Sequence, residues 1–134
     1  MGMTRDELEV CRRVQRRVER EESKLADLRA TLAEVTSRLD GLPHGWNYGS
    51  RIEGLVAKII DLERQIEALK AIWAECIVEL NERLGEVIQN AARRTVLLRR
   101  YGFCRSFDVI IRETGYSRRH VFYLHRKGLR ELGL

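Results

Sequence analysis

The feature that most constrains the fold is a seven-residue repeat of apolar side chains near the start of the chain. The heptad positions are filled by Cys11, Val14, Val18, Leu25, Leu28, Leu32, Val35 and Leu39. Glu21 alone interrupts this stripe, and Thr4 with Glu7 has the spacing of a capping box at the start of a helix. The pattern therefore predicts one long helix over residues 4–39, with a single apolar face.

A second heptad run follows a segment that cannot continue a helix. Residues 40–50 hold three glycines and the only proline, which predicts a loop. Ser50 and Glu53 then predict a second capping box. The second repeat comprises Ile52, Leu55, Ile59, Leu62, Ile66, Leu69, Trp73, Cys76 and Leu80. Two such helices joined by a short loop predict an antiparallel helical hairpin, a coiled coil, over residues 1–90.

The second helix has a wider apolar face than one partner helix requires. The additional apolar residues beside its seam are Val56, Ile60, Ile72, Ile77, Leu84 and Ile88. We expect a second copy of the chain to cover this face, which would make the protein a homodimer. The alternative is that the C-terminal domain covers the end at residues 84–88.

Charge is distributed unevenly along the chain. Residues 1–40 hold nine basic and nine acidic side chains, and residues 41–90 hold five basic and eight acidic ones. Residues 91–134 hold eleven basic and three acidic side chains, a net charge of +8. A polyanionic partner is therefore expected to contact the C-terminal third.

Several other classes of protein are disfavoured. No apolar run reaches the length of a membrane span and no signal sequence begins the chain, so a soluble cytoplasmic protein is expected. The three cysteines are widely spaced, which favours reduced thiols, and Cys11 and Cys76 fall on the apolar stripes as core residues. His120 and His125 would point about 140° apart on a helix, which is poor geometry for zinc. No catalytic set is visible, so we expect no enzyme activity, no metal and no cofactor.

Residues 91–134 predict three short helices. The first runs from Ala91 to Tyr101 and ends at Gly102, and Ser106 can cap a second helix over residues 107–113. Gly115 suits the left-handed backbone of a sharp turn. Ser117 can cap a third helix over residues 118–132. The predicted architecture is all-α, with a helical hairpin followed by a helix-turn-helix domain at residues 91–134.

The outward face of the third helix carries the predicted function. Val121, Leu124, Leu129 and Leu132 can face inward, whereas His125 is expected at the domain surface. In a helix-turn-helix, the N-terminal residues of the second motif helix enter the major groove of DNA. Base-reading roles are predicted for Arg118, Arg119, Phe122 and Tyr123. Phosphate-binding roles are predicted for Arg93, Arg94, Ser117, His120, Arg126 and Lys127.

Residues 93–132 resemble sigma-70 region 4. The resemblance rests on the segments 96–102, 106–110, 115–117 and 128–132, together with Val121. It implies a role at promoters and RNA polymerase as a further partner. Sigma proteins usually have small, acidic or polar residues in place of Val109, Ile111, Phe122 and Tyr123, so the −35 preference of the family does not carry over. The chain also has no region-2-like segment, unlike a complete sigma factor.

The whole chain is similar to phage and prophage late-gene regulators of the RinA and ArpU type. The similarity lies in a heptad hairpin with the turn sequence of residues 42–45, placed before Tyr116-Ser117 and Tyr123-Leu124-His125. The expected function is that of a sequence-specific transcription regulator that binds double-stranded DNA. The alternative is a DNA-packaging protein resembling a small terminase subunit, although those usually place the DNA-binding domain first. A coiled coil with a basic tail would leave the turn at residues 115–117 unexplained.

Overall fold

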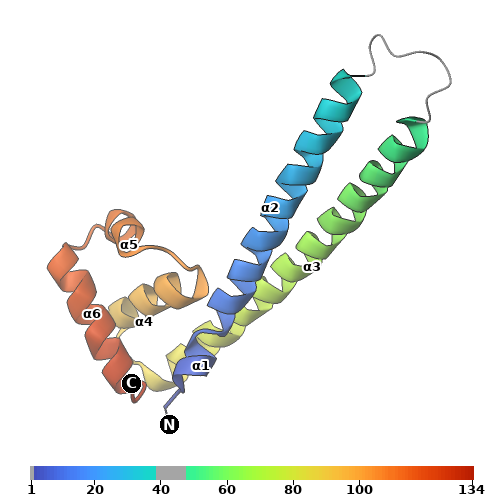
Figure 1. The fold of residues 1–134 in the computed structure, drawn as a ribbon. Helices are drawn as coiled ribbons and strands as arrows, with labels where there is room; N and C mark the ends of the chain where they lie inside the picture. Colours follow the sequence, from blue (N-terminus) through green and yellow to red (C-terminus); the bar gives the residue numbers. More distant parts are fainter. Residues whose placement is uncertain (1, 39–47) are drawn as a thin grey trace. The chain divides into compact units, whose positions relative to one another are not determined.

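The structure, a computed structural model, describes residues 2–38 and 48–134, and this part of the chain is helical without strands. The predicted all-α class is confirmed. The helices, labelled in Figure 1, are α1 Arg5–Leu8, α2 Val10–Ser37, α3 Tyr48–Val87, α4 Ala91–Leu97, the π-helical turn η1 Leu98–Gly102, α5 Phe107–Thr114 and α6 Arg118–Glu131.

The chain forms two compact units, and α2 and α3 contribute to both. One unit comprises the residues up to Gln15 together with Ala71–Leu134, and the other is Arg16–Lys70. The boundary expected at residue 90 does not coincide with this division, because the last turns of α3 and the N-terminal residues share a core with α4 and α6.

The first predicted helix is divided by a short break. The capping box is present, since Thr4 N donates to Glu7 Oε2 and Glu7 N donates to Thr4 Oγ1, each over 3.2 Å. Glu9 has φ −88° and ψ 0°, which ends α1 before α2 begins at Val10. The expectation of one uninterrupted helix is therefore wrong at Glu9. Leu39, its expected last residue, lies outside the described residues.

The second long helix begins earlier than expected. α3 starts at Tyr48, so Ser50 lies within its first turn and the predicted N-cap at Ser50 is wrong. The Ser50–Glu53 spacing alone does not fix the start of the helix, which lies two residues before Ser50. Of the loop predicted over residues 40–50, residues 40–47 lie outside the described residues, and the prediction is wrong at residues 48–50, which are helical.

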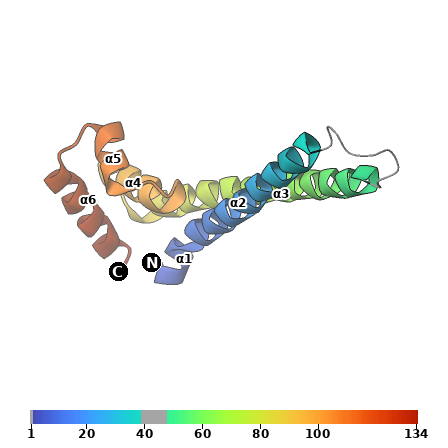
Figure 2. The ribbon, with the colours of Figure 1, turned by 45° about the horizontal axis from the view of Figure 1, so that its top comes forward.

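The unit Arg16–Lys70 is an antiparallel helix pair with one apolar seam. Its buried residues are Leu25, Ile59, Leu62 and Ile66, with Leu28 and Leu32 packed against them. Two ion pairs join the helices, Arg29 to Glu63 at 3.0 Å and Lys70 to Glu22 at 3.3 Å. Figures 1 and 2 show the two helices side by side along this unit. The predicted antiparallel hairpin is confirmed.

The other unit has the larger core. Its buried residues are Met3, Leu8, Cys11, Leu80, Leu84, Ile88, Leu97, Tyr101 and Leu132. The two chain ends meet there, because Met3 N donates to the carbonyl of Leu132 over 3.0 Å. Leu84 and Ile88 have no exposed surface. The end of α3 is thus covered by the chain's own terminal helices.

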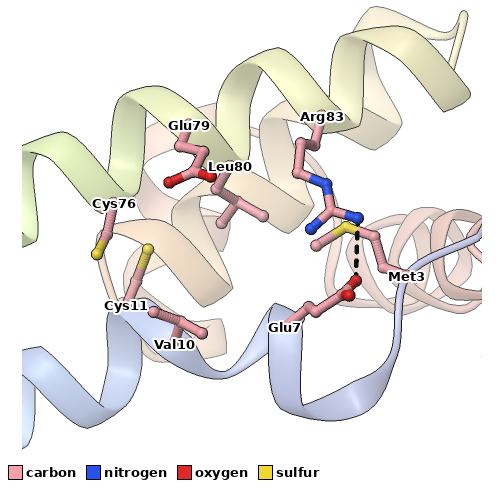
Figure 3. Close-up of a pocket in the computed structure, with 8 residues that line it drawn as sticks. All are labelled: Met3, Glu7, Val10, Cys11, Cys76, Glu79, Leu80 and Arg83. Atoms are coloured by element: carbon pink, nitrogen blue, oxygen red, sulfur yellow. Dashed lines mark hydrogen bonds and ion pairs between the residues drawn. The ribbon is translucent and has the colours of Figure 1, made fainter.

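Figure 3 shows the contact of the N-terminal turn with α3 in this unit. Arg83 Nη2 donates to Glu7 Oε2 over 2.9 Å, beside a pocket of about 230 Å³. The thiols of Cys11 and Cys76 point toward one another (Figure 3), and burial raises the pKa of the Cys11 thiol to about 12. A thiol that stays protonated packs as a small apolar side chain, in agreement with its predicted place in the core.

A second core in the same unit fixes α6. Val96, Ile110 and Val121 are fully buried and Leu124 nearly so, which joins α4, α5 and α6. α6 approaches α4 closely at Gly128, where an added Cβ would lie 2.6 Å from Leu97 Cδ1. The absence of a side chain at residue 128 therefore sets the distance between these two helices.

Candidate nucleic-acid interface

The segment α5–turn–α6 has the local geometry that the sequence predicted. Ser106 Oγ accepts from Val109 N over 3.3 Å, and Ser117 Oγ accepts from His120 N over 3.1 Å, so each serine caps its helix. Gly115 has φ 74° and ψ 3°, and its N–H donates to Ile111 O over 3.0 Å. This left-handed turn directs the chain from α5 into α6.

α6 separates its buried and exposed side chains as expected. Val121 and Leu124 are buried, as is the C-cap residue Leu132, whereas Leu129 is partly buried. The predicted base-reading residues are exposed, as are three of the predicted phosphate-binding residues: Arg118, Arg119, Phe122 and Tyr123, with Ser117, His120 and Arg126. The expected outward face of the helix therefore exists, and the role of each residue on it stays a prediction.

One stripe of this face carries arginines for which the described part of the chain provides no partner. Arg119, Tyr123, Arg126 and Arg130 follow the spacing i, i+4, i+7, i+11, which places them on one side of the helix. Within the described residues, the guanidinium groups of Arg119, Arg126 and Arg130 have no hydrogen bond or ion pair. Arg130 was missed by the sequence analysis, although its spacing from Arg119 would have indicated it.

An aromatic array lies beside this arginine stripe. The rings of Tyr116 and His120 meet edge to face at 5.1 Å, and those of His120 and Tyr123 stack at 6.2 Å. Lys127 Nζ lies 5.8 Å from the centre of the Tyr123 ring. The predicted phosphate ligands His120 and Lys127 are thus placed next to the predicted base reader Tyr123.

Phe122 is supported by side chains of the preceding helices. The centre of its ring lies 4.6 Å from that of Phe107. Arg100 Cζ lies 4.4 Å from the centre of the Phe107 ring, and Arg100 Nη1 donates a hydrogen bond to the carbonyl of Arg105. Phe122 nevertheless remains 39% exposed. An exposed ring held in this way offers an apolar edge, of the kind that contacts a thymine methyl group.

The predicted phosphate ligands Arg93 and Arg94 have partners inside the fold. Arg93 forms an ion pair with Glu131, which joins α4 to α6. Arg94 Nη1 donates to the carbonyl of Ile88 over 2.8 Å, at the end of α3. Both side chains are partly buried. Their phosphate-binding role stays a prediction, and their contacts give them a role in holding α4.

His125 is not the surface residue that the sequence analysis expected. Its Nε2 shares a hydrogen bond of 2.8 Å with the Tyr101 hydroxyl, and its ring meets that of Phe107 edge to face at 5.1 Å. Burial lowers the pKa of His125, and the charges of Arg100 and Arg5 lower it further. Helical spacing could not reveal these partners, because Tyr101 and Phe107 come from η1 and α5.

The acidic side chains of residues 91–134 are all engaged with arginines. Glu113 pairs with Arg99 and Arg105, Glu131 pairs with Arg93, and Asp108 pairs with Arg118. The net positive charge of this segment is consequently concentrated on arginines that have no acidic partner among the described residues, including the stripe of α6. Such an uncompensated patch favours a polyanion.

The six residues proposed for an oligomer face differ in exposure. Val56, Ile60 and Ile72 are 38–46% exposed, Ile77 is partly buried, and Leu84 and Ile88 are fully buried. The last two therefore present no surface to a second copy. Val78, which is 59% exposed, was not among the six. Whether the exposed residues pair two chains stays a prediction.

The described residues contain no cluster of three or more His, Cys, Asp or Glu side chains suited to a metal ion. None of the helices in that part combines the length and apolar character needed to cross a bilayer. Comparison of the chain with models of protein families, with curated proteins and with solved structures gave no match.

Proposed function

We propose that the chain binds double-stranded DNA through α6 and acts as a sequence-specific transcription regulator. The observation that carries this proposal is a stripe of arginines, unpartnered within residues 2–38 and 48–134, on a helix that follows a left-handed glycine turn. Arginine is the side chain that most often reads guanine in the major groove, and it also binds phosphates. A helix of this kind fits the groove with its N-terminal end toward the bases.

The roles on α6 follow from position along the helix. Arg118, Arg119, Phe122 and Tyr123 occupy its first two turns and are assigned to base edges. Arg126, Lys127 and Arg130 lie farther along and are assigned to phosphates. Ser117 accepts one hydrogen bond as a cap, and its hydroxyl proton can donate to a phosphate near His120.

The wider setting follows from the resemblance to sigma-70 region 4 and to phage late-gene regulators. We propose a cytoplasmic regulator of phage or prophage origin that contacts RNA polymerase. We also propose that it acts as a homodimer, with Val56, Ile60 and Ile72 at the interface. Light scattering at micromolar concentration that gave the mass of one chain would contradict the dimer.

The function is tested by selecting duplexes from a random pool with the whole chain and titrating the selected site against scrambled DNA. We expect one enriched sequence, and binding that weakens with salt by about 0.9 in the log–log slope per phosphate contact. Arg119→Ala should reduce binding mainly to the selected site, whereas Arg126→Ala should weaken both duplexes alike. Absence of duplex binding at low salt would overturn the proposal.

A further inference from the structure

We propose that Asp108 is a specificity-determining residue that acts through Arg118. This inference rests on the proposed DNA binding by α6. The carboxylate favours one orientation of the guanidinium, suited to a guanine, and it also disfavours indiscriminate phosphate binding. Asp108 thus weakens binding to DNA in general and sharpens the choice of sequence.

Both members of the pair are fixed by their helices. Asp108 lies in the first turn of α5, where the helix dipole favours a negative charge, and Arg118 is the first residue of α6. The serine caps Ser106 and Ser117 hold the two helix starts. The ion pair of Arg118 Nη2 with Asp108 Oδ1 therefore bridges the two helices of the motif.

The chemistry of the pair suits base recognition. A guanidinium has five N–H donors, and contact of one nitrogen with Asp108 leaves donors for O6 and N7 of a guanine. An arginine that is already oriented loses less conformational freedom on binding. The neighbouring Arg119 has no such partner within the described residues, so it is free to follow either a base or a phosphate.

Asp108 differs from the other acids of this segment in its exposure and in its partner. The side chains of Asp108 and Arg118 are 70% and 62% exposed, and the partner begins the helix assigned to the groove. A carboxylate at that place repels phosphates, which is a device for rejecting wrong sites. Glu131, at the opposite end of α6, pairs instead with Arg93 of α4.

This contrast supplies a matched control. Asp108→Asn and Glu131→Gln each remove one negative charge from an ion pair of the same unit. Affinities of the whole chain would be measured for the selected duplex and for scrambled duplex at one salt concentration. The variants are wild type, Asp108→Asn, Glu131→Gln, Arg118→Ala and the double variant Asp108→Asn/Arg118→Ala, each checked for folding by circular dichroism.

Asp108→Asn is expected to raise affinity for scrambled DNA about twofold and to lower the ratio of selected to scrambled affinity about threefold. Glu131→Gln should leave that ratio unchanged. In the Arg118→Ala background, Asp108→Asn should change the ratio no further, because its effect passes through Arg118.

A purely structural role of Asp108 would lower both affinities by the same factor, and that result would overturn the inference. An unchanged ratio in Asp108→Asn would overturn it as well. If an asparagine at 108 impaired folding, Asp108→Ser would replace it with the same expectations. Failure of the wild-type chain to bind any duplex would instead refute the proposed function itself, which separates the two failures.

Discussion

Core side chains are less completely buried in the helix pair Arg16–Lys70 than in the unit that contains α4, α5 and α6. In the pair, the core residues of the seam keep 4–9% of their surface exposed, and ion pairs across the helices supplement a single stripe. All of the large side chains that are fully buried in the described residues lie in the other unit. A helix that reads DNA must be held within a fraction of an ångström, whereas a spacer or assembly element need not be.

The largest expected difference concerns loss of a core side chain. Ile110→Ala would open a cavity among Val96, Val121 and Leu124, and we expect it to lower the free energy of unfolding by about 4 kcal/mol. Ile59→Ala, in the thinner seam, should cost about 2 kcal/mol because water and neighbouring side chains can fill the space. Urea unfolding of both variants measures the difference. Equal losses would remove the contrast between the units.

Glycine replacements should change stability in opposite directions in the two regions. Gly128→Ala places a methyl group against Leu97 and should cost about 1–3 kcal/mol. Gly54→Ala has open space around it within α3, and should stabilise by up to about 1 kcal/mol through helix propensity. Thermal unfolding compares the two. A stabilising Gly128→Ala would show that α4 and α6 are not in close contact.

A smaller, pH-dependent effect is expected only in the unit that holds His125. Burial lowers the pKa of His125 below its ordinary value of 6.5, so protonation favours the unfolded chain. Its stabilising contribution is complete above pH 6.5 and is lost as the pH falls toward the lowered pKa. The free energy of unfolding should therefore decrease between pH 7.5 and 5.5, and less so in His125→Gln than in the control His120→Gln. The same decrease in both variants would contradict this assignment.

The smallest effect is expected from the ion pairs across the seam. Arg29 and Glu63 are largely exposed, so Glu63→Gln should lower stability by less than about 1 kcal/mol. The difference from wild type should vanish in molar salt. A loss that persisted at high salt would indicate that the pair does more than join two solvated side chains.

The features that could be predicted from the sequence are those set by neighbouring residues. Ser106, Gly115 and Ser117 act within one helical turn, and the heptads specify a seam whatever covers it. The partners of Arg93, Arg94 and His125 could not be predicted, because they come from other helices. Ile60 and Ile88 both lie beside the heptad seam of the second repeat, yet Ile88 is buried and Ile60 is exposed. The fold, and not the local sequence, determines what covers each of them.

The most direct measurement compares two triple variants of the whole chain. Arg119, Arg126 and Arg130 would be replaced by glutamine in one, and the exposed Arg16, Arg17 and Arg20 in the other, so the formal net charge falls equally. Fluorescence anisotropy with a labelled duplex would give the affinity and its salt dependence. If α6 contacts DNA, the first variant should lose at least about a hundredfold in affinity and show a shallower salt slope, while the second stays near wild type. Equal losses in the two variants would show that binding follows net charge alone, and would contradict a DNA-reading α6.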